Sequence, residues 1–262
     1  MATSFDIEPT ARLRGFHFIG TVARRFLISY PVAPAALSSF VPPGGELCTW
    51  RNMAWVSACF VNVKQMRPSF APAPLGFGFN YLIFRTMAEL PFPDGKRRRS
   101  VLILEPNIDS RMPARVGALT GGIRFNVRDI SLSQTEEAWS IVMRSDAGET
   151  LYEAQIRKDS IGPDLPAHSA FPDAATADEF LLGVSYGGQF DKNAKRMTLL
   201  AETHEPWETL VGQCTTKRNA FLESHCKSCV EADHVITMTD IPHYFAAKGH
   251  KLQLDAVNRT QK

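Results

Sequence analysis

His204 opens the segment His204-Glu205-Pro206-Trp207, which places an imidazole beside a carboxylate and close to an aromatic ring. Imidazole exchanges protons near neutral pH, so it suits general acid or base catalysis. We therefore predict His204 as a catalytic residue and Trp207 as a ligand-binding residue. Neighbouring residues of a strand point to opposite faces, so His204 and Glu205 cannot both enter one pocket. The alternative is a packed corner at Pro206 and Trp207, with His204 as a hydrogen-bonded neighbour.

Asn80 and Arg85 lie in the apolar run 79–86 and offer an amide and a guanidinium group. Both groups can bind the carboxylate or the carbonyl of a small ligand. Their odd separation places them on opposite faces of a regular strand, and only a bulge would change this. We predict both as ligand-binding residues and expect at most one of them in a pocket.

Glu105 and Arg111 complete the predicted catalytic residues. Glu105 ends an apolar run, and Arg111 lies in a helix-like segment that follows it. A charge beside apolar strands usually has a partner, which makes both residues candidates for a site. A structural ion pair or a solvated face is the alternative for both of them, and also for Arg85.

Cys226 and Cys229 are followed by His234 at a spacing that supplies three of the four ligands of a tetrahedral zinc site. The fourth position of that spacing holds a threonine, so either His225 or His243 would have to complete the shell. A redox-active pair and two unrelated thiols are the alternatives. We predict no metal and no cofactor for this chain.

The overall composition is that of an ordinary folded domain, with 44% hydrophobic and 21% charged residues among 262. A formal net charge of +2 gives no field that would attract nucleic acid or an anionic membrane. We expect a small-molecule ligand or substrate as the partner, with no nucleic acid and no membrane, and leave a homo-oligomer open. The basic run 96–99 follows turn residues and is expected at a solvated hairpin tip, with an anion or nucleic-acid contact as the alternative.

Targeting signals are not visible in the sequence. No basic segment leads into a long apolar run near residue 1, and no run of about twenty apolar residues occurs, so we expect neither a secretory signal nor a membrane helix. The five cysteines stand at irregular spacing and do not resemble a disulfide framework. We expect a cytoplasmic protein.

Strands must position the candidate residues. Residues 123–130 give the clearest pattern, because Ile123, Phe125 and Val127 alternate with polar residues. The loop 145–149 contains a glycine between two apolar runs and predicts a hairpin. Further strands are predicted at 54–63, 79–86, 100–105, 138–144, 150–156, 197–203, 233–239 and 251–257.

Helices are fewer and short. They are predicted at 33–41, at 109–119 with Ser110 as a possible cap, and at 174–182 after Asp173. Many strands with few helices indicate a mainly β fold, either a barrel or a pair of packed sheets, since sheets must close or cover their edges. No linker divides the sequence, so we predict a single domain across residues 1–262.

Several segments together resemble one known family. They are residues 25–32 with Val-Pro-Pro-Gly at 41–44, then 79–86, then 101–105 leading into 110–121, and finally 204–207 with 230–235. On these segments the chain, over roughly residues 20–245, resembles the acetoacetate-decarboxylase-like superfamily and, within it, the uncharacterised YqjF-like branch. The resemblance implies a cone-shaped antiparallel β-barrel with flanking strands and a few short helices, holding a small-molecule pocket in its interior.

The sequence departs from this family where the chemistry of decarboxylation lies. The family's decarboxylases use a lysine that forms a Schiff base with a keto acid, and a second lysine that makes the first one nucleophilic. At the matching position the sequence reads Ala-Leu-Thr-Gly-Gly (118–122), and no lysine lies between Lys96 and Lys158. The family's arginine near the N-terminal segment would fall around Pro31 and is missing there.

We therefore expect a small-molecule enzyme that acts on a carbonyl- or carboxylate-bearing metabolite in a barrel pocket without an imine. A lyase or a hydrolase of this superfamily would fit that description. The first alternative is a non-catalytic β-barrel that binds or carries an apolar small molecule. The second is an interaction protein with a small zinc site near Cys226.

Overall fold

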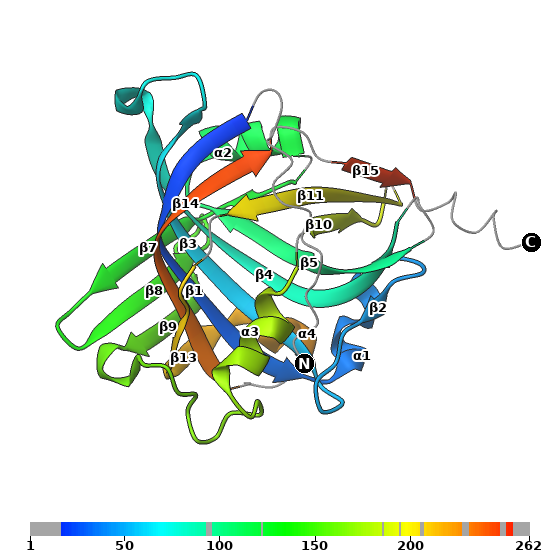
Figure 1. Ribbon diagram of the computed structural model, residues 1–262, viewed down its shortest axis with the longest axis vertical. Coiled ribbons are helices and arrows are strands. Elements are labelled where there is room, and N and C mark those ends of the chain that lie inside the picture. The colour runs from blue at the N-terminus through cyan, green and yellow to red at the C-terminus, as the bar shows by residue number, and fades with distance from the viewer. Residues whose placement is uncertain are drawn as a thin grey trace, which may run out of the picture.

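The computed structural model describes residues 17–92, 96–121, 123–184, 186–193, 195–204, 207–226, 231–246 and 250–253, which are mainly β (Figure 1). The strands are β1 (His17–Val32), β2 (Glu46–Leu47), β3 (Ala54–Pro68), β4 (Phe77–Pro91), β5 (Arg97–Ile108), β6 (Asn126–Val127), β7 (Asp129–Gln134), β8 (Ala138–Arg144), β9 (Thr150–Arg157), β10 (Tyr186–Asp191), β11 (Arg196–His204), β12 (Leu210–Gly212), β13 (Cys214–Asn219), β14 (His234–Ala246) and β15 (His250–Gln253). The α-helices are α1 (Pro34–Leu37), α2 (Arg111–Val116), α3 (Ala174–Leu182) and α4 (Ala220–Cys226). None of the helices in these ranges has the length and hydropathy needed to cross a bilayer.

Eleven strands form one large, curved sheet in the order β12-β14-β1-β3-β4-β5-β10-β11-β15, with β2 beside β4 and β6 beside β5 (Figure 1). Neighbouring strands are antiparallel except that β6 and β10 run parallel to β5. β11 also pairs with β14, from Glu202 opposite Phe245 to His204 opposite His243. The hydrogen-bonded path from β14 through β1, β3, β4, β5, β10 and β11 therefore leads back to β14. The predicted mainly β fold with few short helices is confirmed.

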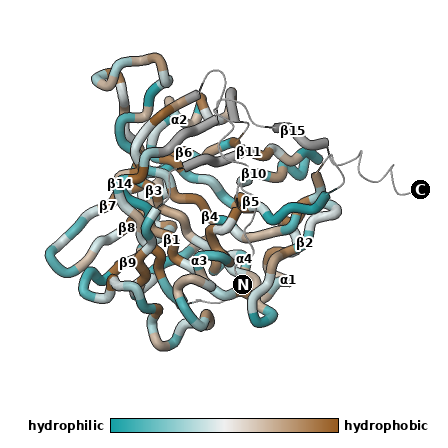
Figure 2. The backbone as a smooth tube through the Cα atoms, in the orientation of Figure 1, coloured by the Kyte–Doolittle hydropathy of each residue, from teal (hydrophilic) through white to brown (hydrophobic). Residues whose placement is uncertain are grey.

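The outer face of the large sheet carries Phe26, Ile28 and Tyr30 and packs against a second sheet of four strands, ordered β13-β9-β8-β7. The Tyr30 hydroxyl lies 3.0 Å from the hydroxyl of Tyr152 and 2.7 Å from that of Thr216, so the interface contains a buried polar link. Hydrophobic residues concentrate where the strands cross the centre of the molecule, whereas the outer tip of the β7–β8 hairpin is hydrophilic (Figure 2).

The inner face of the large sheet carries Leu27 and Cys59, which lie opposite each other in register. Arg25 lies opposite Val61 by the same pairing of β1 with β3. Arg85 on β4 lies opposite the residue two positions before Cys59. Because cross-strand partners share one face of a sheet, Arg25 and Arg85 both belong to the inner face.

α3 covers one end of this inner face. The helix begins as predicted after Asp173, whose side chain accepts a hydrogen bond of 2.7 Å from the backbone N–H of Thr176. Its buried side chains, among them Phe180 and Leu181, pack with the apolar residues of β1 and β3. Its last turn is bound through backbone carbonyls, because Arg99 of β5 donates to the carbonyl of Phe180.

Most strand predictions are confirmed. The predicted runs 54–63, 79–86, 100–105, 138–144, 150–156, 197–203 and 233–239 match β3, β4, β5, β8, β9, β11 and β14, and 251–257 is described as β15 only to Gln253. The predicted hairpin is also present, with Ser145 N–H donating to the Glu149 carbonyl at 2.8 Å. Gly148 has a φ of 82°, which glycine adopts without steric cost. The strands β1, β2, β10, β12 and β13 and the helix α4 were not predicted.

Two local predictions are wrong in extent. Residues 123–130 show the predicted alternation of burial, but ladder pairing begins only at Asn126 in β6, and β7 begins at Asp129. Ile123 and Phe125 pack on the inner face of β5 without backbone pairing, so a period of two can arise from side-chain packing alone. Ser110 precedes α2 but makes no side-chain cap. α2 ends at residue 116 and a π-helical segment continues it from Gly117 to Gly121, so the helical segment covers 111–121 where 109–119 was predicted.

The basic run 96–99 is less solvated than predicted. Arg97 forms ion pairs with Glu46 and Glu89 at 3.1 and 3.6 Å across strand neighbours. Arg98 lies over the ring of Phe92 at 4.5 Å. Arg99 points toward α3 and donates a hydrogen bond to the carbonyl of Phe180, so one residue of the run binds inside the fold.

Candidate functional site

The inner face encloses a small pocket between the central strands of the large sheet. Its volume of about 40 Å³ is room for about three water molecules. We call it the inner pocket; it is lined by Val22, Arg25, Cys59, Val61, Tyr81, Ile83, Arg85, Val101, Ile103, Gly187, Trp207 and Ile241. Most of these residues are apolar, and the polar ones are concentrated in two arginines and one tyrosine.

The two arginines are buried cations. Arg25 is 8% exposed and Arg85 is 6% exposed, although each carries a permanent positive charge. Burying a guanidinium group costs free energy unless hydrogen bonds or an anion compensate it. Two such groups at one small cavity supply hydrogen-bond donors of the kind that bind an anionic ligand.

Each guanidinium group is held by a contact from elsewhere in the fold. Arg25 lies 5.2 Å from the centre of the Trp207 ring, a cation–π distance. The Nη2 of Arg85 donates a hydrogen bond of 2.7 Å to the carbonyl of Leu181, in the last turn of α3. Arg85 therefore joins the inner pocket to the helix that covers it.

The remaining groups limit the chemistry of the inner pocket. None of its described lining residues is a lysine or a carboxylate, so it offers cationic hydrogen-bond donors, the Tyr81 side chain and the thiol of Cys59. Arginine binds carboxylates through two parallel hydrogen bonds and can stabilise a developing oxyanion. The arrangement suits a ligand with a carboxylate beside a carbonyl group.

Comparison with known proteins shows which family the chain belongs to. The profile of DUF2071, described as an uncharacterized conserved protein, matches residues 21–242. The chain belongs to the DUF2071 family. No curated protein matches it.

Solved structures share the fold of this DUF2071 chain. Acetoacetate decarboxylase from Legionella pneumophila is 13% identical with a TM-score of 0.63, over 96% of this chain and 98% of that one. The enduracididine biosynthesis enzyme MppR complexed with pyruvate is 15% identical with a TM-score of 0.62, over 90% and 89%. An acetoacetate decarboxylase-like enzyme from Sphingomonas wittichii RW1 is 11% identical with a TM-score of 0.60, over 96% and 99%. These likenesses confirm the predicted resemblance at the level of fold.

Two of the predicted site residues of the DUF2071 chain line the inner pocket, namely Arg85 and Trp207. Asn80 lies on the same strand as Arg85 but outside the lining set, as expected from their odd separation. Its amide accepts a hydrogen bond of 2.8 Å from Asn62 and donates one of 3.3 Å to the Ile130 carbonyl. Asn80 therefore links β3 and β4 to the start of β7.

The structure describes the side chains of two of the three predicted catalytic residues, Glu105 and Arg111. Glu105 accepts a hydrogen bond of 3.1 Å from Asn107, and the exposed Arg111 begins α2; neither lines the inner pocket. His204 is the last residue of β11 and pairs with His243, but its side chain lies outside the described residues, as do Glu205 and Pro206. The catalytic roles of these residues stay predictions.

Arg25 was missed by sequence reasoning. We expected the arginine of the N-terminal segment near Pro31 to be absent, yet Arg25 of β1 reaches the inner pocket. The available signal was its even separation from Leu27 within an apolar strand, which places both residues on one face.

The predicted zinc spacing is not assembled in the described residues. No group of three or more His, Cys, Asp or Glu side chains gathers there as a metal site, and Cys229 lies outside those residues. His234 is fully buried, with its Nδ1 2.7 Å from Oδ2 of Asp233 and its ring 5.6 Å from that of Phe171. The His234 ring packs against Phe171 in the segment before α3.

Asp233 is a buried carboxylate that the sequence did not single out. Ser169 donates to its Oδ2 at 2.6 Å, and the backbone N–H of Ala170 donates to its Oδ1 at 2.8 Å. Burial alone would raise the pKa of Asp233, but hydrogen bonds from His234, Ser169 and Ala170 outweigh burial and hold the pKa below its ordinary value. The ionised carboxylate therefore ties the segment before α3 to β14.

Proposed function

We propose that this chain is an enzyme that binds a small oxo-carboxylate in the inner pocket and acts on it without an imine intermediate. The observation that carries this proposal is the presence of two buried guanidinium groups, Arg25 and Arg85, at one small cavity. One guanidinium group can bind the carboxylate, and the other can polarise the adjacent carbonyl oxygen. The small volume favours a metabolite of a few carbon atoms, and a structural neighbour that binds pyruvate supports this size class.

The proposed chemistry needs no amine nucleophile. A Schiff base would require a lysine, whereas the described lining residues include no lysine and their two cations are arginines, which stay protonated. Negative charge would develop on the carbonyl oxygen when a proton leaves the carbon next to the carbonyl group, or when a carbon–carbon bond to the carbonyl carbon's neighbour breaks. Arg25 and Arg85 would stabilise this charge. His204 remains our proposed acid-base residue, three positions before Trp207. The pairing of β11 with β14, which leads the strand path of the large sheet back to β14, supports the expected cone-shaped barrel around this pocket.

The alternative function, carriage of an apolar molecule, fits the pocket less well. Val61, Ile83 and Ile103 give the cavity apolar walls. An apolar ligand, however, would sit against two guanidinium groups and would displace any water that solvates them. This cost disfavours the carrier relative to an anion-binding enzyme.

Binding of pyruvate and longer 2-oxo acids, measured by isothermal titration calorimetry, tests the proposal. We expect Arg85→Met and Arg25→Met each to weaken binding by about tenfold or more, because each removes a charge-assisted pair. Arg144→Met is the matched control: Arg144 lies on β8 and pairs with Asp129 at 3.7 Å, far from the lining set. Because Arg85 also binds α3, the Tm of every variant must be measured. Unchanged binding in both pocket variants would contradict the proposal.

Borohydride reduction in the presence of pyruvate tests the absence of an imine. We expect the intact mass of the protein to stay unchanged, since the described pocket residues offer no amine. A reduced covalent adduct would overturn this part of the proposal while leaving oxo-acid binding intact.

Replacement of His204 tests catalysis. Exchange of the C3 protons of a bound 2-oxo acid, which lie next to its carbonyl group, in D2O would report proton transfer and can be followed by NMR. We expect His204→Ala to abolish this exchange with little change in Tm if the imidazole is the acid-base group. A large loss of stability would instead support the packed-corner alternative.

A further inference from the structure

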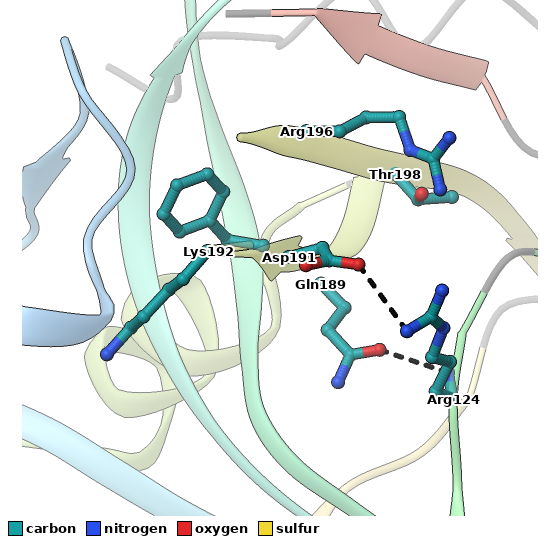
Figure 3. A pocket seen from close by; sticks show the side chains of 7 residues that line it. Arg124, Gln189, Asp191, Lys192, Arg196 and Thr198 are labelled. Carbon is teal, nitrogen blue, oxygen red and sulfur yellow. Dashed lines mark hydrogen bonds and ion pairs between the residues drawn. The ribbon is translucent and has the colours of Figure 1, made fainter. Parts of the chain in front are cut away.

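A second, larger hollow lies at the β10–β11 end of the large sheet, with a volume of about 230 Å³ (Figure 3). We call it the β10–β11 hollow; it is lined by Arg124, Gln189, Phe190, Asp191, Lys192, Arg196 and Thr198. None of these described residues lines the inner pocket. The hollow is therefore a separate candidate site.

Strand register brings its polar groups together. Gln189 lies opposite Thr198, and Asp191 lies opposite Arg196, in the antiparallel pairing of β10 with β11. Cross-strand partners share a face, so these four side chains project to the same side of the two strands. Arg124 comes from the irregular segment before β6 and faces them from the other side of the hollow (Figure 3).

The hollow contains more positive than negative charge. Nη1 of Arg124 lies 3.6 Å from Oδ2 of Asp191, a long single contact, while Oδ1 of Asp191 accepts a hydrogen bond from Asn193. The Nε of Arg196 is shielded from solvent and has no hydrogen-bond partner in the described part of the chain. Lys192 extends away from the two arginines, with its Nζ 4.9 Å from the Phe40 ring (Figure 3). The guanidinium groups of Arg124 and Arg196 therefore share the hollow with one carboxylate, Asp191, which already accepts a hydrogen bond from Asn193.

Neutral groups complete a donor set around the same space. The backbone N–H of Arg124 donates to Oε1 of Gln189 at 3.0 Å, which fixes the amide beside Arg124. The Thr198 side chain is 4% exposed and lies close to the guanidinium group of Arg196 (Figure 3). Donors that converge from several directions match the three oxygens of a phosphoryl group better than the two coplanar oxygens of a carboxylate.

We propose that the β10–β11 hollow binds the phosphoryl group of a small phosphorylated molecule, held by Arg196, Arg124 and Thr198. Asp191 orients Arg124 and lowers the net charge of the hollow. This site is independent of the oxo-acid function proposed for the inner pocket.

Titration of inorganic phosphate into the purified full chain, followed by 1H–15N NMR, tests the proposal. We expect saturable shifts at the amides of Gln189 and Thr198. Arg196→Gln should weaken phosphate binding by about tenfold or more, because a charge-assisted hydrogen bond is lost. Arg124→Gln is the second variant; its side chain is 77% exposed, so the fold should tolerate the change. Asp191→Asn should tighten binding several-fold, since a competing carboxylate is removed.

Arg144→Gln, which makes the same charge change on β8, is the matched control and should bind phosphate as the wild type does. Equal weakening in Arg144→Gln and Arg196→Gln would overturn the proposal, because the effect would then be one of net charge. Shifts that do not saturate would also overturn it. Acetate titrated as a second probe should bind more weakly than phosphate, and equal affinity would refute the assignment of a phosphoryl group.

Discussion

At the scale of single residues, Asp233 shows how hydrogen bonding can outweigh the cost of burial. Its folded-state pKa lies below the ordinary value of 3.8, so its ionised form stabilises the fold. This contribution is fully present above the unfolded pKa and is lost as the pH falls through the lower, folded-state pKa. The partners lie on the segment before α3, so the same carboxylate positions the helix that covers the inner pocket.

Asp233→Asn should therefore lower the free energy of unfolding by about 1–3 kcal/mol at pH 7, because buried donors lose a charged acceptor. Below pH 3.8 the difference between wild type and variant should shrink, since the wild-type carboxyl group becomes protonated. Urea unfolding at pH 7 and at pH 3 measures both values. An equal difference at the two pH values would show that the charge of Asp233 is not the cause.

At the scale of elements, α3 is a short helix whose two ends are held by different means. Its N-terminus is capped by Asp173, and hydrogen bonding to Thr176 lowers the pKa of that carboxyl group. Its C-terminal carbonyls accept hydrogen bonds from Arg85 and Arg99, side chains of β4 and β5. Cations at a helix C-terminus also interact favourably with the helix dipole.

Asp173→Ala should speed hydrogen exchange of the Thr176 amide on the order of 5- to 10-fold at neutral pH, because the cap is lost. Asp173→Ser should restore most of the protection, since serine also caps helices well. Exchange followed by NMR measures this amide directly, with the amides of β8 as an internal reference. Equal exchange in all three proteins would contradict a capping role.

At the scale of the whole molecule, the two sheets are joined by an apolar interface with one polar link. Tyr30 of the large sheet bonds to Tyr152 and Thr216 of the small sheet. Burial raises the pKa of both tyrosines well above the ordinary value, so they remain neutral while the protein is folded. This link makes the two sheets depend on each other for stability.

Tyr30→Phe should cost about 1–2 kcal/mol of stability, because the buried hydroxyl of Tyr152 loses a partner. The double variant with Tyr152→Phe should lose less than the sum of the single variants, since no orphaned hydroxyl of that pair remains. Denaturant unfolding of the four proteins measures this coupling. Additive losses would show that the hydroxyl pair does not connect the sheets.

The sequence by itself determined most of the elements of this protein. The β-branched and aromatic run 54–63, the glycine of the loop 145–149 and the cap at Asp173 each act locally, so local patterns were sufficient to predict β3, the β8–β9 hairpin and α3. The opposite facing of Asn80 and Arg85 also followed from strand geometry alone. Lack of a lysine near residues 118–122 was visible in the sequence as well.

Only the tertiary structure decided which of these residues meet. Arg25 and Arg85 are sixty positions apart, and the pairing of β1 with β3 and of β3 with β4 brings both to one cavity. Arg196 of β11 lies near Arg124 because β11 pairs with β10, and Gln189 of β10 binds the backbone of Arg124. The position of β10 depends in turn on its long-range pairing with β5, which no local period encodes. Register between distant strands depends on packing across the whole sheet, and for this reason both candidate sites emerged only from the folded chain.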